Sequence, residues 1–398
     1  MTMKGRALLV AIVMLAEMWL VGCGHFNCGA TFGASSCSSG TGGISQGGGG
    51  TTKGTYLLVA DAGGIQGEVL DPTAKTISIT PGFGTVSVPS TKVPGDWMAI
   101  AGQKFMYSAY TATGEIWGWS LNGNGTLTAL TGSPVTANFL LNDLSAGTQA
   151  MVANPTGTLL FGLDQASEAI EVYQISTAGA LTGPSTVPLP SGFKPFNLAV
   201  DGLGKYLYVS NVSGLITNQV AVYSITGTTI TAVSGSPFPS NLQQMQGDAS
   251  GKFMIGTTGG FFNGGDMNLY VGSINTSTGA LTIANTTTAG VPVTVTVQPN
   301  TGGTLVYAFD FPNSGGNGSV EGFTLDLSAG GLAAIAGISA TGANGEFDPS
   351  GKYLFVVASS NGVASALNAY DVSAGSALAT PLASVGWAPG AWQAFDTQ

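Results

Sequence analysis

The stretch FNLAVDGLGKYLYVSNVSGLITNQVAVYSITGTTITAVSGSPFP, residues 196–239, contains four short strand patterns. Residues 197–200 form an apolar run, and residues 206–210 alternate between apolar and polar side chains, as a half-buried strand does. A tight turn separates these two patterns, and its Gly204 suits a left-handed backbone conformation. Residues 220–225 and 228–233 predict a third and a fourth strand, so this stretch predicts one four-stranded antiparallel sheet.

The same pattern occurs seven times along the chain. The second strand recurs as TYLLVA (55–60), KFMYSAY (104–110), TLLFGL (158–163), KYLYVS (205–210), KFMIGT (252–257), TLVYAF (304–309) and KYLFVV (352–357). An apolar residue of the fourth strand recurs about every 50 residues, at Ile77, Leu127, Leu181, Ile230, Leu281, Leu332 and Leu378. Four strands at this period are typical of a β-propeller blade. The sequence therefore predicts an all-β, seven-bladed propeller.

The two ends of the repeat array complement each other. The first copy begins at its second strand, at Thr55, so no inner strand precedes it. The segment AWQAFD at 391–396 matches FNLAVD at 196–201, the inner strand of a complete copy. We therefore predict that the C-terminal strand completes blade one, because a closed ring limits exposed strand edges. Residues 54–398 are predicted to form this single domain.

Residues 1–22 are predicted to be a bacterial export signal. Lys4 and Arg6 precede a mostly apolar segment, 7–22, which is short for a membrane-spanning helix. The segment LVGC at 20–23 resembles the lipobox of bacterial lipoproteins, which implies that Cys23 is acylated and anchors the protein to a membrane. Gly24 after this cysteine favours the outer membrane by the same resemblance. The alternative is an ordinary signal peptide with a chance cysteine.

Residues 23–53 are predicted to be a flexible tether, because they are rich in Gly, Ser and Thr and cannot form a core. Cys28 and Cys37 lie in this tether, and an exported compartment permits them to form a disulfide. A metal site formed with Cys23 and His25 is the alternative. Acylation would remove Cys23 from such a site, so no metal or other cofactor is predicted.

Charge is scarce and mostly negative. The chain has a net charge of −10, and 8% of its residues are charged. Nucleic acid is excluded as a partner, because no basic stripe is present to neutralise phosphates.

The turns carry a resemblance to a known family. The segments DGLGKYLYVSN (201–211), DASGKFMIG (248–256) and DPSGKYLFVV (348–357) resemble the YVTN-repeat and lactonase-type seven-bladed propellers, which include bacterial 6-phosphogluconolactonase-like proteins. The resemblance covers residues 54–398 and implies a central channel with catalytic His, Arg and Glu residues. The one His of this chain is His25 and the one Arg is Arg6, both before the propeller. No catalytic residue can therefore be assigned from the family.

Residues at the start of the inner strands are the predicted ligand site. Equivalent positions of a closed ring converge on its channel, and these positions carry Asp96, Trp97, Gln149, Asn197, Gln244, Asn344 and Trp392. Amide groups and aromatic faces suit an uncharged polar ligand such as a sugar or a peptide. The alternative is structural: the two tryptophans pack between blades, and the amides bind water.

Two classes of function follow from these observations. The favoured class is a membrane-tethered binding or scaffold module for a neutral polar ligand or a protein partner. The alternative is an exported lactonase-type hydrolase that uses carboxylates alone. Two close carboxylates with a perturbed pKa at the channel mouth would favour the hydrolase.

Overall fold

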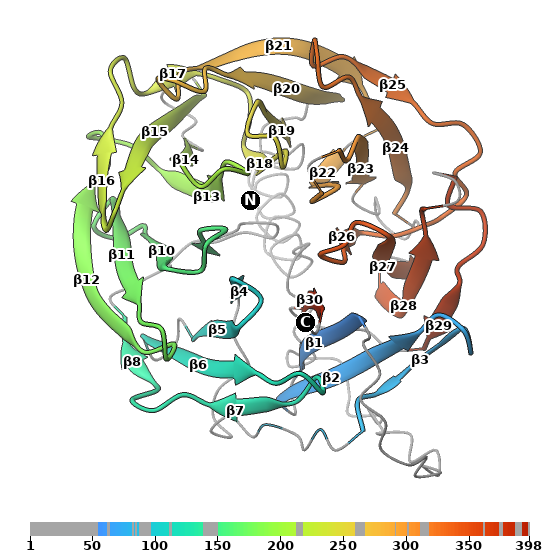
Figure 1. The fold of residues 1–398 in the computed structure, drawn as a ribbon. Helices are drawn as coiled ribbons and strands as arrows, with labels where there is room; N and C mark the ends of the chain where they lie inside the picture. Colours follow the sequence, from blue (N-terminus) through green and yellow to red (C-terminus); the bar gives the residue numbers. More distant parts are fainter. Residues whose placement is uncertain are drawn as a thin grey trace, which may run out of the picture.

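The computed structural model describes residues 55–396 except for 62–63, 82, 84–85, 87–96, 111–113, 138–149, 212–217, 259–266, 291, 301, 311–317, 361–362, 374–376 and 387–391. In this part of the chain the regular secondary structure is entirely β, and thirty strands form seven antiparallel sheets. The sheets stand in a ring, and one strand of each sheet lies nearest the centre (Figure 1). This arrangement confirms the predicted seven-bladed propeller. The predicted export signal, the tether and its three cysteines lie outside the described residues.

Four blades account for the first part of the ring, and their strands run from the channel outward. Blade 1 contains β30 (Trp392–Asp396), β1 (Thr55–Asp61), β2 (Gly64–Asp71) and β3 (Thr76–Ile79). Blade 2 contains β4 (Trp97–Ala101), β5 (Phe105–Tyr110), β6 (Glu115–Leu121) and β7 (Leu127–Ala129), with β8 (Val135–Thr136) also paired to β6. Blade 3 contains β9 (Met151–Ala153), β10 (Leu159–Asp164), β11 (Ala169–Ile175) and β12 (Leu181–Pro188). Blade 4 contains β13 (Pro195–Val200), β14 (Tyr206–Asn211), β15 (Gln219–Thr226) and β16 (Thr229–Ala232), with β17 (Phe238–Pro239) also paired to β15.

Three further blades complete the ring in the same order. Blade 5 contains β18 (Gln244–Gly247), β19 (Phe253–Thr257), β20 (Asn268–Ile274) and β21 (Leu281–Thr288). Blade 6 contains β22 (Pro292–Val297), β23 (Leu305–Asp310), β24 (Val320–Leu325) and β25 (Leu332–Ala334). Blade 7 contains β26 (Asn344–Phe347), β27 (Tyr353–Ser360), β28 (Val363–Asp371) and β29 (Ala383–Val385).

The ring closes between the two ends of the described chain, in blade 1. Strand β30 pairs antiparallel with β1, with Asp396 opposite Thr55 and Trp392 opposite Val59. Strand β30 thus takes the inner position that β4, β9 and β13 hold in their own blades (Figure 1). The predicted closure is confirmed, and the inner edge of β1 is paired.

The outer strand of blade 7 lies later in the chain than predicted. The repeat pattern placed it around Leu378, whereas β29 covers Ala383–Val385. Leu378 is instead buried in an apolar cluster between blades 6 and 7, where its carbonyl accepts a hydrogen bond from the Ser339 amide at 3.3 Å. The apolar residue that marks a strand in six blades therefore marks an inter-blade contact in the seventh.

A recurrent side chain holds the turn between the inner and the second strand. In blade 4, Asp201 Oδ1 accepts hydrogen bonds from the Lys205 and Tyr206 amides at 2.7 and 2.6 Å. Gly204 in this turn has a φ of +67°, which glycine adopts without strain. Asp248 and Asn154 accept from the amides four and five residues later in the same way. These turns fix one end of every inner strand they follow, and so they shape that end of the channel.

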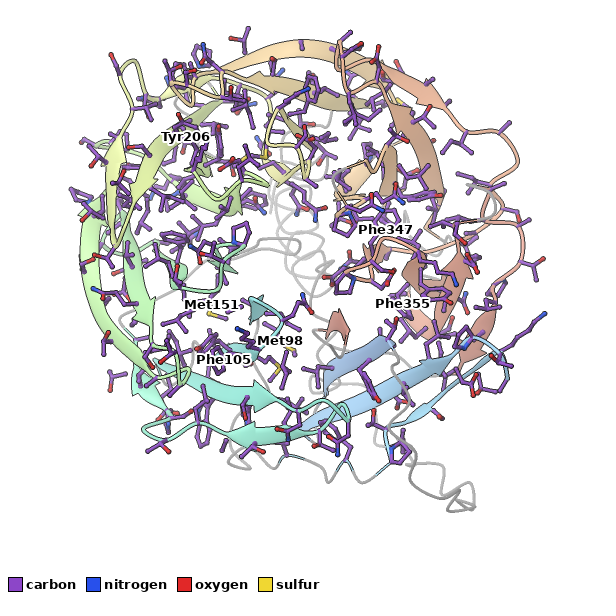
Figure 2. The ribbon with its side chains drawn as sticks, in the orientation of Figure 1. Met98, Phe105, Met151, Tyr206, Phe347 and Phe355 are labelled. Carbon is purple, nitrogen blue, oxygen red and sulfur yellow. The ribbon has the colours of Figure 1, made fainter. Side chains whose placement is uncertain are left out.

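The hydrophobic core is divided among the interfaces between blades. Each apolar cluster combines residues of neighbouring blades, and one of them joins blades 2, 3 and 4. Figure 2 shows members of three clusters: Met98 of β4 packs toward blade 1, Met151 of β9 belongs to the cluster of blades 2 to 4, and Phe355 lies in blade 7. Polar contacts cross the same interfaces, as where Tyr208 Oη donates to the Gly279 carbonyl of the next blade at 3.2 Å. Neighbour-to-neighbour packing therefore keeps the ring, and its channel, rigid.

Candidate functional site

A cavity of about 560 Å³ occupies the channel at the end where the inner strands run into their turns. Six of the seven blades contribute to its wall. Its polar lining residues are Gln103, Asn154, Asp201, Gln246, Thr296 and Glu346, and its apolar ones include Ile100, Val152, Leu198, Met245, Val297 and Phe347. A cavity of this size can enclose a small molecule.

The wall of the cavity has a polar side and an apolar side. We call the residue that begins the turn after each inner strand, such as Asp201 in blade 4, the turn anchor. Two residues before the turn anchor, the inner strand carries Gln246, Thr296 and Glu346 in the consecutive blades 5, 6 and 7. In blades 3 and 4 the same position carries Val152 and Ala199. Blades 6 and 7 lie across the ring from blade 3, whereas blades 4 and 5 are neighbours (Figure 1), so these polar positions form one arc of the wall and the aliphatic positions an adjoining arc. The channel is therefore amphipathic in cross-section.

Glu346 supplies the ionisable group of the polar side. It lies on β26 of blade 7, opposite Phe355 of β27, and its half-buried side chain lines the cavity. Burial raises the pKa of Glu346 from 4.5 to about 8, because the charged form loses its hydration. The carboxyl group is consequently protonated at neutral pH, when it donates one hydrogen bond through its hydroxyl and accepts others.

Gln246 and Thr296 extend this polar side into the neighbouring blades. Gln246 Oε1 accepts a hydrogen bond from the Val297 amide at 2.8 Å. This bond holds the side chain in place and leaves its NH2 group as a hydrogen-bond donor. The Thr296 side chain is 3% exposed and lies between Gln246 and Glu346 in ring order. Together these three residues provide uncharged donors and acceptors along one arc of the channel.

Asp201 is the second carboxyl residue of the cavity wall, and its role is structural. Besides the two bonds at Oδ1, its Oδ2 accepts from the Leu203 amide at 3.2 Å. Burial raises the pKa of Asp201, while the three backbone hydrogen bonds act in the opposite direction. Because its oxygens are engaged in the turn, Asp201 does not form a pair of reactive carboxylates with Glu346.

The predicted site residues lie toward the opposite end of the inner strands. Trp97, Gln244, Asn344 and Trp392 each begin an inner strand, as predicted, and Asn197 lies near the start of β13. Asp96 and Gln149, and the side chains of Trp97 and Trp392, are outside the described part of the structure. A ring of equivalent positions is therefore present in the backbone.

The three predicted amides whose side chains are described are occupied or buried. Asn197 and Gln244 are each 4% exposed, and Asn197 Oδ1 and Gln244 Nε2 have no hydrogen-bond partner. Asn344 Oδ1 accepts from the Gly345 amide at 2.8 Å and from Thr294 Oγ1 at 3.5 Å. The cavity is instead lined by residues further along the same strands, and sequence reasoning did not single out Glu346. The signal was available as the one acidic residue two positions before a turn anchor.

Cationic groups do not contribute to this cavity. Its described lining contains no Lys, Arg or His, and His and Arg are absent from residues 55–398 of the sequence. Within the described ranges no group of three or more His, Cys, Asp or Glu residues is placed to hold a metal ion. Those ranges also contain no helix long and apolar enough to cross a membrane. The chemistry of the site is therefore hydrogen bonding and apolar contact.

Known structures share this fold. The periplasmic gluconolactonase of Pseudomonas aeruginosa is 14% identical, with a TM-score of 0.63 over 87% of this chain and 100% of its own. A protein from Lactobacillus plantarum is 18% identical, with a TM-score of 0.56 over 86% of this chain and 99% of its own. A functionally unknown protein from Desulfotomaculum acetoxidans is 13% identical, also with a TM-score of 0.56 over 86% and 99%. Neither a protein-family model nor a curated protein matches the sequence. At these identities the similarity establishes the propeller fold.

Proposed function

We propose that this protein is an extracytoplasmic binding module that holds an uncharged, hydroxyl-bearing small molecule in its channel. The observation that carries the proposal is the amphipathic cavity, in which Gln246, Thr296 and protonated Glu346 form a polar arc and Val152, Leu198 and Ala199 provide apolar surface. A sugar or a lactone ring matches this wall, because it has hydroxyl groups at its edge and an apolar face. An anionic ligand would meet no cation there.

A direct binding measurement tests this function. Isothermal titration with neutral monosaccharides, neutral aldonolactones and their carboxylate or phosphate derivatives should show heat for neutral compounds and none for anionic ones. Glu346→Gln should keep binding, since an amide also donates and accepts, whereas Glu346→Leu should weaken it at least about tenfold through loss of a buried hydrogen bond. Asp326→Asn, an exposed change in blade 6, is the matched control. Preference for the anionic compounds would refute the proposal.

The protein is proposed to act from a membrane surface. The lipobox-like LVGC segment at 20–23 and the Gly-rich residues 23–53 support acylation at Cys23 followed by a flexible tether. The fold shared with a periplasmic protein is consistent with a place outside the cytoplasm. Gly24 favours the outer membrane, and a disulfide between Cys28 and Cys37 fits the same compartment.

Lactone hydrolysis is the second candidate, and one observation favours it. Glu346 has a pKa of about 8, which suits a group that transfers protons near neutral pH, and the fold is shared with a gluconolactonase. The engagement of Asp201 in its turn leaves Glu346 without a second free carboxyl group in the wall. We therefore expect glucono-lactone opening at the spontaneous rate. Turnover well above that rate, lost in Glu346→Gln, would replace binding by catalysis as the function.

A further inference from the structure

Glu68 occupies a position that the repeat otherwise gives to an aromatic side chain. It lies on β2 opposite Leu57, two residues before the last apolar residue of the strand. In blade 4 the same register places Tyr223 opposite Leu207, and in blade 2 it places Trp119 opposite Met106. The equivalent residues of the other blades are Tyr173, Gly272, Phe323 and Tyr370. Five of the six other blades therefore bury an aromatic ring where blade 1 buries a carboxyl group.

This position faces the interface between the last and the first blade. Leu57, the cross-strand neighbour of Glu68, packs in one apolar cluster with Phe355 and Leu367 of blade 7. Leu70, which shares a face of β2 with Glu68, belongs to the same cluster. Blade 1 is also the blade that β30 completes. Glu68 thus lies at the interface between blade 7 and blade 1, the blade in which the ring is closed, and we call this interface the seam.

The Glu68 carboxyl group is buried without full compensation. Its side chain is 5% exposed, and its Oε2 has no hydrogen-bond partner. Other acidic residues of third strands are paired: Glu171 Oε2 accepts from Tyr173 Oη at 2.5 Å, and Glu321 Oε1 accepts from the Gly290 amide at 3.1 Å. An unpaired buried carboxylate is costly, so burial shifts the equilibrium at Glu68 toward the neutral form.

Few titratable groups surround this carboxyl. From blade 7, β27 contributes the Tyr353 ring to the same cluster, and Asp371 of β28 lies opposite Tyr353, 4.0 Å from exposed Lys352. Strand β29 and strand β3 have no titratable residue. On β1, Tyr56 packs toward blade 2 instead. Burial, which removes the hydration of the charged form, raises the pKa of Glu68 from 4.5 to about 7.

We propose that Glu68 makes the seam between blades 7 and 1 responsive to pH: the seam is tight when the carboxyl is protonated and loosens when it ionises. The direction follows from linkage. A carboxyl that is harder to ionise in the folded state contributes stability below its unfolded pKa, and this stability is lost as the pH rises through the folded value. The ordinary and raised values place that loss between about pH 4.5 and 7. The contribution of Glu68 to the stability of the seam is therefore lowest at neutral pH and above.

Urea unfolding of the full chain across pH 4 to 8 tests the proposal. For the wild type, this one group should raise the equilibrium constant for unfolding by up to about 300-fold over that range. Glu68→Gln cannot ionise and should lose this component of the pH profile. Glu68→Tyr introduces the aromatic residue found in most other blades and should also lose this component of the pH profile. If one of the two variants does not fold, the other is enough for the test. Asp71→Asn, which removes an exposed carboxyl at the end of the same strand, should keep the wild-type profile.

Amide hydrogen exchange separates a seam effect from a general loss of stability. At pH 8, β1 and β30 of the wild type should lose protection before β13 and β14 of the opposite blade, and Glu68→Gln should abolish this difference. Equal loss in both blades would overturn the proposal. A wild-type pH profile in Glu68→Gln and Glu68→Tyr would overturn it as well.

Discussion

Asp201 and Glu68 are buried and Glu346 is half-buried, and these three carboxyl residues of one ring each have a different set of contacts. Asp201 accepts three backbone hydrogen bonds and forms part of a turn. Glu346 lines a cavity together with the neutral polar residues Gln246 and Thr296. Glu68 lies among apolar side chains of two blades. The same functional group therefore serves as a turn anchor, a ligand contact and a source of pH dependence, because its environment decides which protonation state is stable.

Removal of the turn anchor should destabilise blade 4. We expect Asp201→Ala to lower the free energy of unfolding by about 2–4 kcal/mol, because three backbone amides lose their acceptor. Asp201→Asn should cost under about 1 kcal/mol, since Asn154 anchors the equivalent turn of blade 3 through the same two contacts. Urea unfolding curves of both variants provide the measurement. Equal losses for Ala and Asn would show that the hydrogen bonds are not responsible.

Ligand affinity should depend on pH through Glu346. Its carboxyl is a hydrogen-bond donor below its raised pKa of about 8 and an acceptor-only anion above it. We therefore expect affinity for a neutral ligand to be constant from pH 5 to 7 and to fall as the pH rises through 8. Titrations of Glu346→Gln should show a flat profile over the same range. Stronger binding at high pH would instead indicate a cationic ligand.

The residue scale is also where prediction from sequence was weakest. The identity of Asp201 as a turn residue could be predicted, since its bonds are local in the chain. The properties of Glu346 and Glu68 could not, because their burial depends on blades far away in sequence. Asn197 and Gln244 were predicted to face a ligand from their repeat position alone, and the structure buries both. Periodicity locates a residue on a strand, but it does not say which end of a channel is open.

At the scale of elements, the hairpin and the blade are the units that local sequence determines. Strand order and closure could be predicted because each blade repeats the same alternating strands and turn. The outer strand of blade 7 could not be placed, because Leu378 is an apolar residue that packs equally well between blades. The outer strand β29 pairs with β28 through only three residues, so few backbone contacts fix its position.

Strand β30 should be required for stability. Deletion of residues 387–398 removes the inner strand of blade 1 and leaves the inner edge of β1 unpaired. We expect a markedly lower melting temperature or aggregation, because unpaired edges associate with one another. Differential scanning calorimetry together with light scattering provides the measurement, and replacement of 397–398 alone is the control. An unchanged melting curve would mean that the pairing of β30 with β1 contributes little.

At the scale of the whole molecule, the ends of the propeller lie together. Thr55 begins β1 opposite Asp396, the last described residue of β30. Asp396 is the repeat equivalent of Asp201, which lines the cavity, so the chain enters the ring at the cavity end. A tether attached before Thr55 would therefore join the propeller at the cavity end of the channel.

Membrane attachment should depend on Cys23. We expect the intact mass of protein extracted from membranes to include acyl chains, because the lipobox-like segment ends at this residue. Cys23→Ser should move the protein to the soluble fraction, while Cys28→Ser should leave it attached. Retention of Cys23→Ser in membranes at the wild-type level would contradict lipid anchoring.

The pairing of β1 with β30 sets the order in which the molecule can be completed during synthesis. A ribosome produces β1 near the beginning of the described chain and β30 near its end. The strands of six blades and three strands of blade 1 are therefore synthesised before β30. Until β30 is made, the inner edge of β1 has no strand to pair with. A premature stop before Trp392, or proteolysis of the final segment, would leave this intermediate permanent. Completion of the ring therefore depends on β30, which is synthesised after every other strand of the described chain.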